Sequence, residues 1–134
     1  MAGVANFNLV RLSSVIPPGA VVETVAGGDQ LVGGHGDLLY CVYAEAHAEI
    51  PWHEAWAGVA WALAEDGSGA GLFVEHEGPS REQVERDLTS SLDDLILGRG
   101  GGYRGAGRLV TSAVCETEPV CALVVATFTS KGWV

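Results

Sequence analysis

The chain has 134 residues, 48% hydrophobic and 18% charged, which is enough for one domain with a hydrophobic core and too few for two, so we expect a single domain over residues 1–134. A formal net charge of −10 disfavours nucleic acid and anionic lipid surfaces as partners and favours cationic small molecules. The composition shows no low-complexity tract, which argues against intrinsic disorder.

The termini and cysteines give no sign of export. Residues 1–12 carry Arg11 as their only charge and lack the basic start and apolar block of a secretory signal. The longest strongly apolar stretch, residues 121–128, is too short to span a bilayer. We therefore expect a soluble, cytoplasmic protein. The three cysteines contain no Cys-x-x-Cys pair, and we expect buried free thiols.

The first half of the chain predicts mainly strands. Residues 8–16 form a β-rich run that ends at a Pro-Pro-Gly sequence, and residues 20–26 could form a second short strand. The glycine-rich residues 27–36 predict an exposed connection, and the alternation in residues 37–50 predicts a strand. Residues 52–64 suit either a buried helix or a strand, and periodicity does not decide between them.

The next segment predicts a short strand and a helix. The strand covers residues 71–77, and Ser80 with Gln83 then forms a capping box, in which each side chain satisfies the other residue's backbone amide. Apolar residues recur at helical spacing after the cap, at Val84, Leu88, Leu92 and Leu95. The helix is expected to end at Gly98 and the glycines after it.

The remaining segments complete an α+β pattern. Glycines in residues 98–107 predict a flexible connection, and residues 108–116 and 120–129 predict two further strands. Several strands, one long helix and two more strands favour an α+β domain in which helices cover antiparallel sheet. No internal repeat or linker indicates a second domain.

Two segments resemble one known family. Residues 6–19, Asn-Phe-Asn-Leu-Val-Arg-Leu-Ser-Ser-Val-Ile-Pro-Pro-Gly, are similar to the processing-site signature of pyruvoyl-dependent arginine decarboxylases. Residues 71–78, Gly-Leu-Phe-Val-Glu-His-Glu-Gly, resemble the family's strand that bears a catalytic glutamate, and the predicted helix follows in the expected place. The tail around residues 121–123 and Trp133 also fits, so the resemblance extends from about residue 2 to the C-terminus.

The resemblance implies a proenzyme that cleaves itself between Ser13 and Ser14. The Ser14 hydroxyl would attack the carbonyl of Ser13, which converts the amide to an ester, and β-elimination and hydrolysis would then convert residue 14 to a covalent pyruvoyl group. This group would be the cofactor, acting as an electron sink when carbon dioxide leaves the substrate. Without the surrounding signature, a pair of serines at a strand end would indicate an ordinary turn or cap.

The resemblance also implies roles for Asn8 and Glu75. Asn8 would form a hydrogen bond near the scissile peptide or the bound substrate, although a polar residue there could also simply face solvent. Glu75 would donate a proton to the decarboxylated carbanion. Glu77 points to the same face of the strand and is the alternative to Glu75, and either residue could be an ordinary solvent-facing glutamate.

The implied fold is the family's four-layer αββα sandwich, with residues 52–64 as a strand. The implied assembly is a homotrimer or a dimer of trimers with active sites at subunit boundaries. The implied reaction is α-decarboxylation of a small amino-acid substrate, arginine to agmatine and carbon dioxide.

Two alternatives to this reaction stay open. The substrate could be another amino acid, or the chain could be a non-cleaving, non-catalytic homologue that acts as a binding or partner subunit. In the family, an acidic residue upstream of the signature contacts the guanidinium of arginine. The residues before Ser14 contain no acidic residue, so no position in this sequence can be assigned that contact. A separate partner chain could complete the pocket.

Other motifs suggest no further chemistry. Four histidines, together with Glu45 and Glu49, could suggest metal binding, but their spacings match no standard metal motif, and we expect no metal site. These histidines are His35, His47, His53 and His76. The glycines of residues 98–107 neither follow a predicted strand nor open a helix, so we expect no phosphate-binding loop there.

Overall fold

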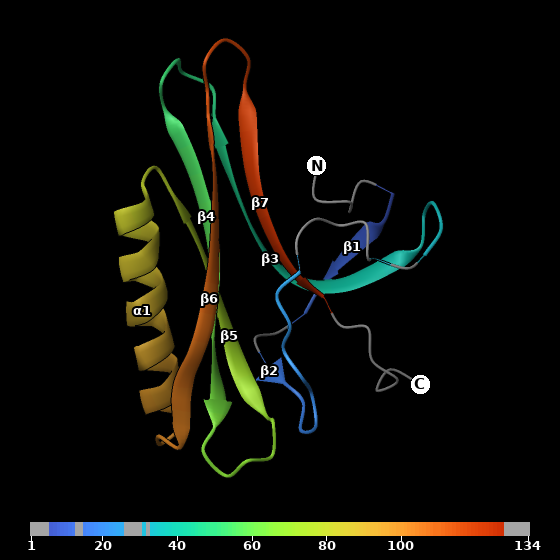
Figure 1. Cartoon of the computed structure of the whole chain (residues 1–134), viewed down its shortest axis with the longest axis vertical. Helices are drawn as coiled ribbons and strands as arrows, with labels where there is room; N and C mark the ends of the chain where they lie inside the picture. The colour runs from blue at the N-terminus through green and yellow to red at the C-terminus, as the bar shows by residue number, and fades with distance from the viewer. Residues whose placement is uncertain (1–5, 13–14, 26–30, 32, 128–134) are drawn as a thin grey trace.

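The computed structural model describes residues 6–12, 15–25, 31 and 33–127. Two β-sheets pack face to face, and one helix covers the outer face of the larger sheet (Figure 1). The strands are β1 (Asn8–Arg11), β2 (Val15–Ile16), β3 (Leu38–Ala48), β4 (Glu54–Ala64), β5 (Gly71–Gly78), β6 (Tyr103–Val114) and β7 (Val120–Thr127), and helix α1 spans Arg81–Gly98. The larger sheet has the order β2-β5-β4-β6 and the smaller one β1-β3-β7. The predicted α+β class is therefore confirmed.

Small side chains fill the space between the two sheets. Alternate residues of β3 face inward and meet inward residues of β4 and β7, and most of these side chains are alanines. The cluster comprises Ala44, Ala46, Ala48, Ala55, Ala57, Val59, Cys115, Ala122 and Val124. Because alanine adds little bulk on a strand face, the two sheets can pack closely where this cluster lies.

Strand β4 is buried on both faces, which explains its ambiguous sequence. One face contributes Ala57 to the layer between the sheets, and the other contributes Ala60 to the layer under α1. A strand buried on both faces needs no polar alternation, so periodicity could not separate it from a helix. Gly58 faces α1, and a Cβ at this position would lie 2.9 Å from Leu88 Cδ1, so glycine is what allows the helix to approach β4.

The predicted helix and its start are confirmed. The hydroxyl of Ser80 accepts a hydrogen bond from the backbone N–H of Gln83 at 3.2 Å. Val84, Leu88 and Leu92 are buried against β4 and β5. No helix in the described part of the chain is long and apolar enough to cross a lipid bilayer.

Three sequence-based predictions need correction. The run predicted as one strand over residues 8–16 contains two strands, β1 and β2, which belong to different sheets. Residues 20–25 form no strand, and Ala26 lies outside the described residues. Cys121 is exposed, because it lies on the outer face of β7, whereas Cys41 and Cys115 are buried as expected.

The glycine-rich connection predicted for residues 98–107 is also wrong in part. Strand β6 already begins at Tyr103 and pairs with β4 as far as Val114. Gly107 lies under the indole ring of Trp61, where a Cβ would clash with the ring, so a packing contact requires this glycine. A β-bulge between the Trp61 and Ala62 pairs accommodates the extra residue of β6.

Candidate active site

The chain crosses from one sheet to the other at the predicted processing site. Strand β1 pairs in parallel with β3, and the backbone N–H of Leu12 donates to the carbonyl of Cys41 at 2.9 Å. Val15 begins β2, which pairs antiparallel with β5 in the other sheet (Figure 1). Ser13 and Ser14 lie outside the described residues, but their described neighbours Leu12 and Val15 are held in different sheets.

The segment after the processing site is firmly anchored. Ile16 is 1% exposed and belongs to a buried cluster with Val42 and Phe73, which joins the two sheets at this point. Beyond the two prolines, the N–H of Gly19 donates to the carbonyl of Ser68 at 2.7 Å. These contacts fix the chain on the C-terminal side of Ser14.

Glu75 lies on β5, the strand next to β2. Neighbouring Val74 packs under α1, so alternation directs Glu75 toward the three-stranded sheet. Because Val15 pairs with Leu72 in antiparallel register, moving along β5 toward Glu75 means moving toward the residues that precede Val15. The direction of the strands therefore places Glu75 on the side of the predicted cleavage point.

Arg11 connects β1 to Glu75. Its Nη2 atom lies 3.0 Å from Glu75 Oε1, and the two side chains are 55% and 23% exposed. The guanidinium also lies 5.0 Å from the centre of the Tyr43 ring, and Nη2 donates to the Tyr43 carbonyl at 3.4 Å. A carboxylate, an aromatic face and a carbonyl are the groups that proteins use to bind a guanidinium.

Sequence reasoning assigned no role to Arg11. The available signal was its place in the signature, two residues before Ser13. Its partners Glu75 and Tyr43 come from other strands, so only the fold reveals the contact.

Asn8 lies at the other end of β1. Its Nδ2 donates to the Gly36 carbonyl at 2.9 Å, and its backbone N–H donates to the Asp37 carbonyl at 2.8 Å. Within the described residues, no hydrogen bond joins Asn8 to Glu75 or Arg11. Asn8 thus fastens β1 to the loop that enters β3, and its predicted role beside the substrate stays a prediction.

The structure distinguishes Glu75 from its neighbours on β5. Glu77 is exposed, and no ion pair involves it among the described residues. His76 faces the opposite side of the strand, where its Nε2 lies 2.5 Å from the Ser91 hydroxyl of α1. Glu75 is the glutamate of this strand that is partly shielded from solvent and joined to the signature segment.

Cys41 is the buried thiol beside this site. It is fully buried and lies opposite Arg11 in the register of β1 and β3. Burial raises the pKa of the Cys41 thiol, and the positive charge of Arg11 offsets part of that rise. A neutral buried thiol is a poor nucleophile, so Cys41 contributes packing here.

A separate hollow of about 320 Å³ lies beside β4 and β6. It is lined by Leu63, Ala64, Glu65, Arg104, Gly105 and Ala106. None of these residues belongs to β1, β2 or β5, so this hollow is distinct from the Glu75 site.

Comparison with known proteins identifies the same family as the sequence signature. The family model described as pyruvoyl-dependent arginine decarboxylase matches residues 1–131. A pyruvoyl-dependent arginine decarboxylase of Halobacterium salinarum is 33% identical over 129 residues, which cover 95% of this chain and 78% of that protein.

Two further relatives match over shorter segments. Pyruvoyl-dependent arginine decarboxylase 2 of Archaeoglobus fulgidus is 30% identical over 74% of this chain and 62% of its own length. The pyruvoyl-dependent arginine decarboxylase of Methanocaldococcus jannaschii is 30% identical over 65% of this chain and 50% of its own length. The chain thus spans about half to four-fifths of these curated relatives. The resemblance seen in the two sequence segments is confirmed.

Proposed function

Because the chain belongs to the pyruvoyl-dependent arginine decarboxylase family, we propose that it is a carboxy-lyase that converts arginine to agmatine and carbon dioxide. The family name implies a covalently bound pyruvoyl group, for which Ser14 is the proposed source. The observation that carries the proposal is the contact between the signature segment and the predicted proton donor, the ion pair from Arg11 to Glu75.

The residues on either side of Ser13 and Ser14 support a pyruvoyl group at position 14. Leu12 is bonded to β3 and Val15 pairs with β5, so these two flanking residues are held by different sheets. A held geometry is what self-cleavage requires, because the Ser14 hydroxyl has to be aimed at the Ser13 carbonyl. Once formed, the pyruvoyl group would supply an electron-withdrawing carbonyl for the amine of the substrate.

Cleavage would leave β1 on the short N-terminal piece and β2 on the long one. Four register pairs join β1 to β3, and Arg11 and Asn8 add side-chain contacts to Glu75 and Gly36. We propose that these contacts keep the short piece in place after cleavage. The site would then be assembled from both pieces of the chain.

Glu75 is the proposed proton donor. Its side chain is 23% exposed, so it is shielded from bulk water and yet accessible from the site. Arg11, whose Nη2 atom lies 3.0 Å from Glu75 Oε1, serves as a positioning residue for Glu75.

The finer architecture and the assembly are also proposals. The described residues supply one helix layer and two sheet layers, and the proposed αββα arrangement would need a second helix layer. Exposed Ile50 and Trp52, at the turn between β3 and β4, support contact with further copies of the chain in a trimer or dimer of trimers. The cytoplasmic location and a separate partner chain stay predictions.

The experiment that tests the function is a decarboxylation assay on purified protein without added pyridoxal phosphate. A panel of amino acids is supplied, and carbon dioxide and amine products are measured. We expect arginine turnover that phenylhydrazine, a carbonyl reagent, abolishes, and none from Ser14→Ala. Turnover of a different amino acid would support the alternative substrate, and an uncleaved, inactive protein would support the non-cleaving, non-catalytic alternative.

A further inference from the structure

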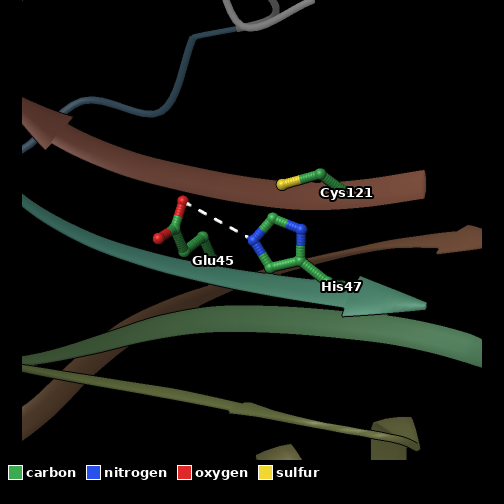
Figure 2. Close-up of side chains that lie close together, drawn as sticks. All are labelled: Glu45, His47 and Cys121. Atoms are coloured by element: carbon green, nitrogen blue, oxygen red, sulfur yellow. Dashed lines mark ion pairs between the residues drawn. The ribbon is translucent and has the colours of Figure 1, made fainter. Parts of the chain in front are cut away.

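Three potential metal ligands come together on the outer face of the three-stranded sheet, away from the proposed active site. Glu45 and His47 project from β3, and Cys121 projects from β7 (Figure 2). One potential ligand atom from each residue lies within 4.8 Å of the other two.

The antiparallel register of β3 and β7 creates this cluster. His47 lies directly opposite Cys121, and Glu45 is two residues from His47 on the same face. The intervening Ala46 faces the core, which fixes the outward direction of both neighbours. Glu45 Oε2 lies 4.0 Å from His47 Nε2, and Figure 2 shows Cys121 beside the imidazole ring.

We propose that Glu45, His47 and Cys121 form a binding site for Zn²⁺, with water as the fourth ligand. Thiolate, imidazole and carboxylate together suit zinc, and three protein ligands plus a water is a recognised zinc arrangement. Ligand atoms around tetrahedral zinc lie about 3.3–3.8 Å apart, given bond lengths of about 2.0–2.3 Å. The cluster has to contract by roughly an ångström to reach that separation.

The side chains are free to make that adjustment. Those of His47 and Glu45 are 61% and 52% exposed, and Cys121 is also exposed. Rotation about their side-chain bonds does not disturb the alanine-rich cluster between the two sheets, because these three side chains lie on the opposite face. The two paired strands provide a rigid base, so the cost of ordering the site is limited to three side chains.

The electrostatics of the cluster favour a cation. Partial burial and the negative charge of Glu45 both raise the pKa of the Cys121 thiol. A zinc ion at the centre stabilises the thiolate and pairs with the carboxylate, so it relieves the repulsion between them. Binding is accordingly accompanied by release of the thiol proton at neutral pH.

This site is independent of the proposed decarboxylase function. Glu75 lies on the other sheet, and neither cluster shares a residue with the other. Spacing along the sequence gave no metal motif, because the thiol comes from a strand near the other end of the chain. Zinc would tie β3 to β7 at the end of the sheet nearest the β3–β4 turn.

The test is a Co²⁺ titration of the full, tag-free protein, followed by absorption spectroscopy. Thiolate ligation gives a sulfur-to-cobalt charge-transfer band in the near ultraviolet, and tetrahedral cobalt gives intense visible bands. We expect both bands to saturate at one cobalt per chain and to disappear when Zn²⁺ displaces the cobalt. Absence of the charge-transfer band would overturn the proposal.

Matched variants identify the ligands. Cys121→Ser should abolish the charge-transfer band. His47→Ala and Glu45→Gln should each weaken cobalt affinity by at least about 10–100-fold, because loss of a residue that merely hydrogen-bonds to a metal ligand already has an effect of that size. The exposed residues His53 and Glu116 serve as controls, and H53A and E116Q should bind cobalt as the wild type does. A band that persists in Cys121→Ser would refute the assignment. Zinc should also slow alkylation of Cys121 in the wild type, and an unchanged rate would contradict the site.

Discussion

Substituting Glu75 by glutamine should separate catalysis from stability. The side chains of the Arg11–Glu75 pair are 55% and 23% exposed, so the pair contributes only about 0–1 kcal/mol to the free energy of unfolding. Glutamine keeps the shape of the side chain and can still accept a hydrogen bond from Arg11. The melting temperature of Glu75→Gln should therefore fall by no more than about 4 °C.

Turnover should respond much more strongly. A positioned general acid contributes about 10²–10⁴-fold to a rate, so Glu75→Gln should lower kcat for arginine decarboxylation by at least about 100-fold. Self-cleavage should proceed, because Glu75 is proposed to act on the substrate carbanion and not on the Ser13 carbonyl. The measurements are kcat from carbon dioxide release, the extent of cleavage from mass spectrometry and the melting temperature.

Glu77→Gln is the matched control, since Glu77 is on the same face of β5, is exposed and has no ion pair among the described residues. Its kcat should change by less than about threefold, because Glu77 is not proposed to transfer a proton to the substrate. Equal losses in the two variants would refute the assignment of Glu75, and so would a Glu75→Gln protein that fails to fold.

Three further predictions concern packing, capping and thiol reactivity. Gly58→Ala places a Cβ 2.9 Å from a leucine methyl of α1 and should lower the free energy of unfolding, measured in urea, by about 1–3 kcal/mol. Gly98→Ala meets no atom within 4 Å and should be neutral or slightly stabilising. Similar losses of stability in the two variants would contradict close packing of α1 on Gly58. Ser80→Ala removes the helix cap and should cost about 0.5–2 kcal/mol; unchanged stability in urea would show that the cap adds nothing. The charge of Glu45 contributes to the raised pKa of the Cys121 thiol, so Glu45→Gln should lower that pKa and speed disulfide-exchange labelling of Cys121 near neutral pH. A slower labelling reaction in Glu45→Gln would contradict this prediction.

The sequence predicted those elements whose signals are local. The alternation in β3 and the Ser80 cap with its helical stripe indicated a strand and a helix directly. Strand β4 gave no such signal, because both of its faces are buried. The glycines before Arg108 indicated a loop, yet Gly107 is part of strand β6. A glycine occupies this strand position because the Trp61 ring leaves no room for a Cβ.

The two motifs were recognisable in the sequence, but the contacts between their residues were not. The signature segment and the Glu75 strand were recognisable as motifs, and the family comparison confirmed the resemblance. The division of residues 8–16 between two sheets and the ion pair of Arg11 with Glu75 depend on which strands become neighbours. The approach of Cys121 to His47 follows from the β3–β7 register in the same way.

The central claim is that the chain is a self-processing proenzyme, and intact mass spectrometry of the purified protein under denaturing conditions tests it most directly. The account predicts two species, a peptide that ends at Ser13 and a long chain that begins with a pyruvoyl group at position 14. The same sample under native conditions should show both pieces together, because β1 stays paired with β3. Ser14→Ala should remain one chain. A wild-type protein that keeps its full-length, unmodified mass after prolonged incubation would contradict the account.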